Sequence, residues 1–456
     1  MASGRITQPG FNQRKPAHRT VLLQLDLSKA FDMVSHNKLL KDLNTTTLPP
    51  EFKRWFGCYL HGRQSRVLFR NETSTARNVR TGVLQGAVTS PILFNFYLAN
   101  LPPPPAGVAV MQYADDMSVY SSGVKIPDMT ARINSYVPSL LDFLRERELE
   151  FSAEKSTVTL FTPASGEAGI HPQVLVDGKL VKLEKEPKLL GVVFDTMYTF
   201  GKHAKQTIAK GKSKINILKQ LAGTQWGQDK ETLITTYKAI GRSTLEYAAP
   251  IWAPAISDTH WQNLQNTQNH ALRTATGCLL MSSQDHLHQE SMVMPIWQHS
   301  ELLTKQFLAG SFLPNNPGHQ HLNRQPPPRR MKETLLKYES EVANQYTLPA
   351  TQDEYKKVLK SIHTASVKKS IEDAAPNRVL QSLPPAINPA EQSLSRRART
   401  GLAQLRSGFS RKLKSYLHRM DETVTDQCPK CSASPHNTAH LFNCRNDETD
   451  LTVESL

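Results

Sequence analysis

The sequence predicts an α+β region over residues 1–200, followed by a helical region, a connector and a small basic module at the C-terminus. Three observations support this. Strand-like and helix-like patterns alternate over the first 200 residues. The pattern from about residue 201 to 310 is helical. Three of the five cysteines fall within the last 30 residues. A chain of 456 residues is long enough for about two to four such units.

The composition excludes several classes of protein. Hydrophobic residues make up 39% of the chain and charged residues 21%, which is not typical of a collagen, a disulfide-dense miniprotein or a wholly disordered chain. There is no run of about 18 apolar residues, so no transmembrane helix is predicted. Residues 1–10 are polar and lack the apolar segment of a signal peptide. We therefore expect an intracellular protein, in the nucleus or the cytoplasm, that is neither secreted nor bound to a membrane.

The net charge is strongly positive. Lysine and arginine number 55 against 40 acidic residues, which gives +15. Such a charge attracts polyanions, of which nucleic acid is the most common, although a basic protein with no such partner is the alternative. Two segments concentrate the charge: residues 202–219 contain six lysines and residues 396–419 contain eight lysines or arginines, and neither contains an acidic residue.

The first expected strand is an apolar run at 20–25, with Asp26 at its end, and a helix is expected at 36–43. Next, Gly82 and Gly86 bracket a short loop.

An apolar helix follows the loop. Ser90 is its expected N-cap and Pro91 its first residue, and the proline run 102–105 ends it.

Residues 108–121 predict a hairpin with Asp115 and Asp116 at its tip. A helix at about 128–148, a strand at 156–161 and a short hairpin within 187–200 complete this region.

The interval 311–395 is predicted to be a partly flexible connector with one or two helices. It contains the proline-rich runs 326–330 and 383–385. The final segment, 396–456, combines the second basic run with the cysteine cluster.

Asp26, Asp115 and Asp116 form the sharpest group of candidate site residues. Three carboxylates at strand ends repel one another unless cations neutralise them, and Mg²⁺ prefers such hard oxygen ligands. Two Mg²⁺ ions held together activate an attacking oxygen and stabilise a leaving phosphate oxygen, which is the chemistry of nucleotidyl transfer. The alternative is a plain exposed turn, because turns favour adjacent aspartates.

Taken together, the segments resemble a known family. LDLSKAFD at 25–32, GVLQG at 82–86 and YADD at 113–116 occur in the order of the successive motifs of non-LTR retrotransposon reverse transcriptases. Glu-Lys-Ser at 154–156 and Leu-Leu-Gly-Val at 189–192 resemble the next two motifs. The resemblance implies an antiparallel palm sheet with helices.

The domain layout implied by this resemblance has four parts. They are a palm over 1–200 with its fingers truncated, a helical thumb over 201–310, the connector over 311–395, and a basic, zinc-knuckle-like module over 396–456.

The resemblance also implies roles for single residues. Asp26, Asp115 and Asp116 would hold two Mg²⁺ ions and form the catalytic trio. Lys155 would act as a general acid that protonates the leaving pyrophosphate; an exposed lysine with no such role is the alternative.

Three further residues match nucleotide-binding or template-binding positions of the family. Phe31 would exclude a ribose 2′-hydroxyl, and a core aromatic is the alternative. Gln85 and Gly86 would contact the incoming nucleotide and the template, and a plain turn before a helix is the alternative.

The function implied is RNA-directed DNA polymerisation, with an RNA template, a DNA primer or target, and deoxynucleoside triphosphates as partners. The endonuclease and the N-terminal fingers motifs of the family are expected to lie outside this chain. A catalytically silent remnant that binds nucleic acid through its basic segments and zinc knuckle is the alternative, and a host-adopted regulatory protein is a third possibility.

The C-terminal cysteines have the spacing of a metal site, Cys428-x2-Cys431-x8-His440-x3-Cys444. Three thiolates and one imidazole are a typical tetrahedral Zn²⁺ ligand set. His436 is a competing ligand, and a set of loose thiols in a frayed tail is the alternative.

The eight basic residues before the cluster suit phosphate contacts, or else form a solvated helix face. Cys58 and Cys278 are expected to be buried, inert thiols.

Overall fold

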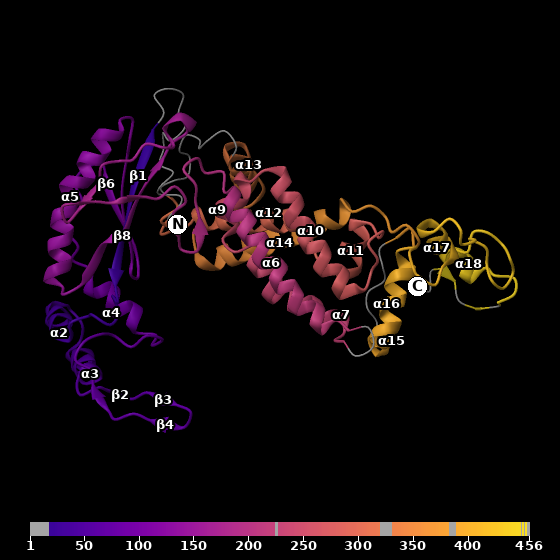
Figure 1. Cartoon of the computed structure of the whole chain (residues 1–456), viewed down its shortest axis with the longest axis horizontal. Coiled ribbons are helices and arrows are strands. Elements are labelled where there is room, and N and C mark those ends of the chain that lie inside the picture. The colour runs from indigo at the N-terminus through magenta and orange to yellow at the C-terminus, as the bar shows by residue number, and fades with distance from the viewer. Residues whose placement is uncertain are drawn as a thin grey trace. The chain divides into compact units, whose positions relative to one another are not determined.

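A computed structural model describes residues 18–223, 227–319, 331–382, 389–447, 449–450 and 452–453 (Figure 1). The chain divides into two compact units. One comprises Met1–Tyr198 with Asn323–Lys332, and the other comprises Thr199–Leu322 with Glu333–Leu456. None of the described helices is long and apolar enough to cross a membrane.

The first unit is built on a five-stranded sheet in the order β11-β8-β1-β7-β6. Its strands are antiparallel except that β11 runs parallel to β8. The elements of this unit are β1 (Arg19–Ser28), α2 (His36–Thr45), α3 (Pro50–Leu60), β2 (Gln64–Ser65), β3 (Leu68–Phe69), β4 (Glu72–Thr73), β5 (Arg77–Asn78), α4 (Ser90–Tyr97), β6 (Val108–Tyr113), β7 (Asp116–Gly123), α5 (Ile126–Glu146), β8 (Glu150–Phe161), η1 (Ser165–Glu167), β9 (Leu175–Val176), β10 (Lys179–Leu180), β11 (Lys182–Leu183), β12 (Lys188–Leu189) and β13 (Val192–Val193).

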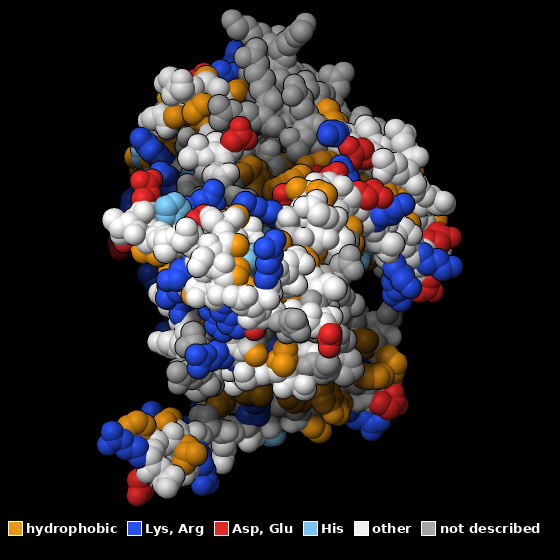
Figure 2. Space-filling view, turned by 90° about the vertical axis from the view of Figure 1, so that its right-hand side faces the viewer, with side chains coloured by type: hydrophobic (Ala, Val, Ile, Leu, Met, Phe, Trp, Pro, Cys, Tyr) orange, Lys and Arg blue, Asp and Glu red, His pale blue; other side chains and the backbone are white. Residues whose placement is uncertain are grey.

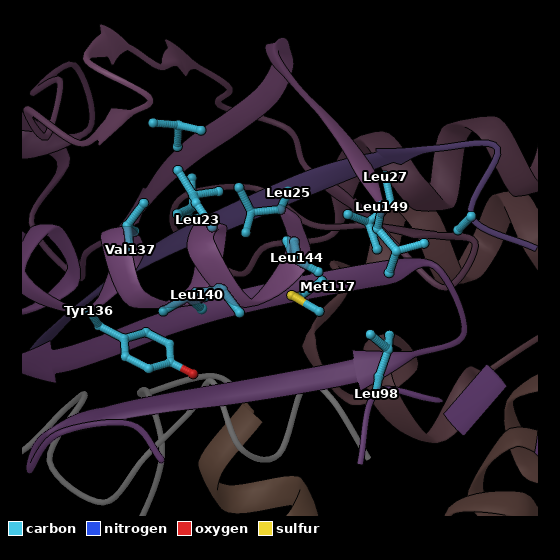
Figure 3. Packing of buried hydrophobic residues seen from close by; sticks show 14 of the residues in the cluster. Leu23, Leu25, Leu27, Leu98, Met117, Tyr136, Val137, Leu140, Leu144 and Leu149 are labelled. Carbon is cyan, nitrogen blue, oxygen red and sulfur yellow. The ribbon is translucent and has the colours of Figure 1, made fainter. Parts of the chain in front are cut away.

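The two-residue period of a strand explains how the sheet acquires a buried face and a second, more polar face. In β1, the alternate residues Val21, Leu23, Leu25 and Leu27 all join one hydrophobic core. Figure 3 shows leucines of β1 meeting apolar side chains of α5. The other alternate set of β1, which includes Asp26, therefore lies on the opposite face.

Most elements expected from the sequence are confirmed. The strand near 20–25, the hairpin at 108–121, the long helix after it and the short hairpin near 190 are all present. The expected N-cap is wrong by one residue. Thr89 is the N-cap and Ser90 is already helical. The Ser90 hydroxyl instead donates a hydrogen bond to the carbonyl of Leu84, 2.6 Å away, so it closes the preceding loop.

The second unit is helical. Its elements are α6 (Gly201–Leu221), α7 (Lys230–Thr236), the π-helical segment η2 (Tyr237–Arg242), α8 (Ser243–Leu245), α9 (Ala249–Trp252), η3 (Ala253–Ala255), α10 (Asp258–Thr276), α11 (Gln284–Ser291), α12 (Ile296–Ser311), α13 (Met331–Gln345), α14 (Gln352–Glu372), α15 (Pro389–Ser393), α16 (Arg396–Arg406), α17 (Lys414–Met420) and α18 (Thr438–Phe442). One apolar cluster joins α6, α7 and α10, and another joins α12, α13 and α14.

The connector contains more helix than the sequence predicted. Within its described residues, α13, α14 and α15 form where one or two helices were expected. The N-terminus of α14 has a strong local signal, because Thr351 and Glu354 form a reciprocal capping box. The proline-rich runs 326–330 and 383–385 lie outside the described residues.

The loop at 82–86 depends on Gly82. Its φ of +88° lies in the left-handed region, and an added Cβ would stand 2.9 Å from the Cα and from the carbonyl oxygen of Asp32. We expect Gly82→Ala to lower the free energy of unfolding by about 2–4 kcal/mol in urea denaturation, because both the backbone conformation and the close contact oppose a methyl group.

Gly57→Ala is the matched control. Gly57 lies inside α3, and an added Cβ there would meet no atom within 4 Å. Alanine should stabilise that helix by about 1 kcal/mol. A Gly82→Ala variant as stable as the native chain would contradict the close packing of the loop.

Candidate active site and metal centre

The sheet brings Asp26 and Asp116 together. β1 and β7 pair antiparallel with Leu25 opposite Met117, and one further step in that register sets Asp26 across from Asp116. Leu25 and Met117 belong to the buried core, so the two aspartates lie on the opposite face of the sheet. The candidate carboxylates are therefore aligned by strand pairing.

Asp115 lies in the tight turn between β6 and β7. Tyr113 pairs with Asp116, which leaves Ala114 and Asp115 as the two turn residues. Ala114 has φ of +52°, a left-handed conformation that is costly for a residue with a Cβ. The hairpin thus holds the carboxylate of Asp115 beside that of Asp116, at the expense of local backbone strain.

The electrostatics of Asp116 fit a cation site. Partial burial raises the pKa of Asp116, and the negative charges of Asp115 and Asp26 raise it further, whereas Lys188 lowers it. The three carboxylates repel one another, and divalent cations relieve such repulsion.

An irregularity in β8 places Lys155 beside Asp26. Gln24 pairs with Thr157, but Asp26 pairs with Ser152, so residues 153–156 bulge out of the register. The Lys155 Nζ consequently lies 4.0 Å from the Oδ2 of Asp26, with its side chain largely exposed.

Ser156 supports this bulge from inside. The Asp26 backbone N–H donates a hydrogen bond to the Ser156 Oγ, 3.3 Å away, and the Ser156 hydroxyl donates to the Ser152 carbonyl at 2.7 Å. Ser156 is buried, so these two hydrogen bonds take the place of hydrogen bonds to water that burial removes.

The glycine loop is attached to the segment that follows β1. The backbone N–H of Val83 donates to the carbonyl of Phe31 at 2.8 Å. The Gln85 amide donates to Asp32 Oδ1 at 3.1 Å, and both Gln85 and Gly86 are exposed. Phe31 is half-buried and stacks on Phe94 of α4, with ring centroids 4.7 Å apart. Phe31 is thus both a core contact and a partly open side chain.

The four cysteine and histidine ligands expected in the C-terminal module come together. Their ligand atoms all lie within 4.8 Å of one another, and the residues are Cys428, Cys431, His440 and Cys444. The sulfurs of Cys428 and Cys444 are 3.9 Å apart, and Cys431 Sγ is 3.3 Å from His440 Nε2. Tetrahedral thiolates about 2.3 Å from zinc stand about 3.8 Å apart, so this cluster could hold a metal ion.

The competing ligand His436 is directed elsewhere. Its Nδ1 accepts a hydrogen bond from the backbone N–H of Lys414 at 3.0 Å, so that nitrogen anchors the module to α17. Burial raises the pKa of Cys428, but backbone N–H donors of Cys431 and Lys430, together with His440, outweigh it and lower the pKa to about 6. A thiol that ionises this readily suits metal binding.

Comparison with known proteins assigns the N-terminal region. Residues 3–194 match the family model described as reverse transcriptase (RNA-dependent DNA polymerase). This chain contains a reverse transcriptase domain of the non-LTR retrotransposon type. The domain includes the three aspartates, Lys155 and the glycine loop, and it excludes the Cys/His cluster.

Relatives of this reverse transcriptase domain are encoded by mobile elements. The chain is 27% identical over 313 residues to a probable RNA-directed DNA polymerase from transposon X-element of Drosophila melanogaster, which covers 68% of this chain and 34% of that protein. It is 26% identical over 260 residues to the RNA-directed DNA polymerase from mobile element jockey of Drosophila funebris, with coverage of 56% and 28%. The chain thus spans about a third of the length of these relatives.

Among solved structures, an apo telomerase from Candida tropicalis is similar to this chain at a TM-score of 0.35. The two chains share 11% identity, over 83% of this chain and 56% of the telomerase.

Sequence reasoning about the reverse transcriptase domain missed Lys188. It is the first residue of β12 and pairs with Val193 of β13, and its charge lowers the pKa of Asp116. The Gln24 side chain donates to the Lys188 carbonyl at 3.2 Å, which fixes this backbone against β1. A lysine directly before the Leu-Leu-Gly-Val motif was the available signal, but only the fold brings it to the carboxylates.

The basic segment outside the reverse transcriptase domain corrects another expectation. Arg399 and Arg406 are buried and make ion pairs instead of facing phosphate. Arg399 pairs with Glu231, and Arg406 Nη2 lies 3.0 Å from Glu391 Oε2. A charge in the interior needs such a partner.

Arg396 of the same segment donates to backbone carbonyls at the end of α10.

The two cysteines outside the Cys/His cluster differ in burial. Cys278 is buried, as expected, and burial raises its pKa to about 12. Cys58 was expected to be buried but is exposed, because it lies on the outer face of α3.

Proposed function

We propose that this chain catalyses RNA-templated DNA synthesis, with Asp26, Asp115 and Asp116 as its catalytic carboxylates. The observation that carries the proposal is the alignment of Asp26 with Asp116 on one face of paired strands, with Asp115 in the adjoining turn. The reverse transcriptase family match covers all three residues and supports the same reading. The substrates would be an RNA template, a DNA primer and deoxynucleoside triphosphates.

The three carboxylates fit a pair of Mg²⁺ ions. They are hard oxygen donors, and the pKa of Asp116 is raised first by burial and then by the charges of Asp115 and Asp26. Bound there, Mg²⁺ would activate the attacking hydroxyl and stabilise charge on the leaving phosphate oxygen. The protein contributes the alignment, because β1 and β7 hold the carboxylates on rigid strands.

Residues around the carboxylates would bind and orient the nucleotide. Phe31 stacks on Phe94, and in this proposal its ring would exclude a ribose 2′-hydroxyl. The Gln85 amide donates to Asp32, and the exposed loop at Gln85 and Gly86 would contact the nucleotide and the template. Lys155 would donate a proton to the pyrophosphate oxygen as the primer 3′-oxygen replaces it on the α-phosphorus.

The remaining regions would take nucleic-acid-binding roles. In this proposal residues 1–200 form the palm, 201–310 the thumb, 311–395 a connector and 396–456 a zinc-knuckle module. The positive charge of the chain supports contacts with the template and primer. Zinc is the metal proposed for the Cys/His cluster, since its spacings fit tetrahedral thiolate and imidazole ligands.

Primer extension tests the proposed activity. Purified chain, a DNA primer annealed to an RNA template, deoxynucleotides and Mg²⁺ should give extended product in a denaturing gel. The Asp115→Asn/Asp116→Asn double variant should lose at least about a hundredfold in rate, because both changes remove metal-binding carboxylates.

Asp128→Asn is the matched control, because Asp128 is an exposed aspartate in the first turn of α5, the helix that packs on the face of the sheet opposite Asp26. It should keep the native rate. If the native chain gives no product but still shifts RNA in a gel, the proposed polymerase is overturned in favour of a silent nucleic-acid-binding remnant.

Lys155→Gln tests the general acid. We expect the rate of single-nucleotide addition to fall by about a hundredfold, because the leaving pyrophosphate loses its proton donor. Lys179→Gln removes another exposed lysine of the same unit and should not change the rate. An unchanged rate in Lys155→Gln would leave Lys155 with only its ion pair to Asp26.

Metal analysis tests the Cys/His cluster. The purified chain should contain about one zinc ion, and Cys444→Ser should reduce this to well below half, because the tetrahedral set loses a thiolate. Cys58→Ser removes the exposed cysteine of α3 and should leave the zinc content unchanged. Chelation should also increase proteolysis of residues 396–456. Equal zinc contents in all three proteins would rule out this site.

A further inference from the structure

The segment 50–80 of the first unit forms a lobe that has no core of its own. It consists of α3 and the two-stranded ribbon β2–β5, and Figure 1 shows the ribbon extending away from the five-stranded sheet. All residues of the ribbon from 64 to 78 are exposed. An isolated two-stranded ribbon is only marginally stable in water, so such a surface is expected to have a partner.

The helix of the lobe presents an aromatic stack. Trp55 lies parallel to Tyr59, with ring centroids 5.3 Å apart and planes 8° apart. The guanidinium of Arg63 lies over the other ring of this pair, Tyr59, 5.5 Å from its centroid. Trp55 is the outer member of the stack of Arg63, Tyr59 and Trp55, and it is 51% exposed. Phe52, one helical turn before Trp55, is 57% exposed. Rings held in this way offer flat faces to further planar groups.

The ribbon carries a second apolar group near its tip. Val67, Leu68 and Phe69 are 69%, 72% and 68% exposed. Arg70 lies over the Phe69 ring at 5.3 Å, and Arg70 and Asn71 form the tight turn, both with positive φ. Figure 2 shows hydrophobic and basic side chains together on the small lobe at the bottom of the view.

The charge of the lobe selects its partner. Residues 61–80 contain five arginines, at positions 63, 66, 70, 77 and 80, and the single acidic residue Glu72. A protein partner would have to be strongly acidic, whereas nucleic acid supplies phosphates for the arginines and flat bases for the rings. Exposed aromatic faces interleaved with arginine are the usual means of binding single strands without reading sequence. Paired bases would offer no free faces to Trp55 or Phe69.

We infer that this lobe is a binding site for single-stranded nucleic acid, in which bases stack on Trp55 and Phe69 while the arginines contact phosphates. The proposal that the lobe binds a single strand depends only on these aromatic and arginine side chains, and not on the proposed polymerase activity. The identity of the strand, an unpaired stretch of the template, rests on the proposed function.

Fluorescence anisotropy with a labelled RNA of about 20 nucleotides tests this site. The assay contains no deoxynucleotides, so it gives a result whether or not the chain extends primers. Trp55→Ala/Phe69→Ala should weaken binding of the single strand at least about tenfold without changing its salt dependence. Arg66→Gln/Arg77→Gln should make the log–log salt slope shallower by about 1.4, because two phosphate contacts are lost.

A matched control lies in the first unit, outside the lobe. Arg132→Gln removes an exposed arginine of α5, the helix that packs on the face of the sheet opposite Asp26. This variant should bind as the native chain does. All variants change exposed side chains, and circular dichroism with thermal melting checks that each is folded.

Three outcomes would overturn the inference. They are unchanged affinity in both lobe variants, an equal loss of affinity for the RNA annealed to its complement, and self-association of the native chain that the lobe variants abolish. The last would assign the lobe to a second copy of this chain. Loss of primer extension in the Asp115→Asn/Asp116→Asn variant with RNA binding intact would separate this site from the polymerase site.

Discussion

The antiparallel pairing of β1 with β7 is the constraint on which the rest of the first unit depends. It forces alternate residues of β1 into the core under α5, and by the same alternation it sends Asp26 to the opposite face, across from Asp116. A shift of one residue would bury the carboxylates and expose the leucines. The stability of the core and the position of the candidate active site therefore have one cause.

Around this pair, the site is completed by segments that depart from regular structure. Ala114 takes a left-handed conformation, residues 153–156 leave the β8 register, and the glycine loop packs against the backbone of Asp32. Strain of this kind persists where the surrounding fold over-determines it, and it is concentrated at functional sites. Here the irregular segments carry Asp115, Lys155 and Gln85. The regular strands therefore align Asp26 with Asp116, and the irregular segments bring the other candidate side chains to the same site.

Positive charge serves two different purposes in this chain. In the helical unit, Lys230 lies 2.8 Å from the carboxylate of Glu290, and Arg406 is buried beside Glu391. Removing one partner of such a buried pair would cost about 3–5 kcal/mol, because it leaves the other charge buried without a partner, so these cations are needed where α7, α11, α15 and α16 pack together. The arginines of the lobe at 50–80 are mostly solvent-exposed and stay available to a polyanion. A net charge of +15 alone does not distinguish the two groups.

The sequence by itself determined the strand near 20–25, the hairpin at 108–121, the long helix after it, the candidate aspartates and the ligand spacing of the Cys/His cluster, because these depend on short-range pattern and local chemistry. It did not predict α3, the ribbon at 64–78 or the third helix of the connector. It could not determine which cations are buried, since Arg399 and Arg406 meet their acidic partners only after distant helices pack. Nor could it place Lys188 beside Asp116 or show that Trp55 stacks outward on α3. Those results depend on contacts between segments far apart in the chain, and only the tertiary structure decides them.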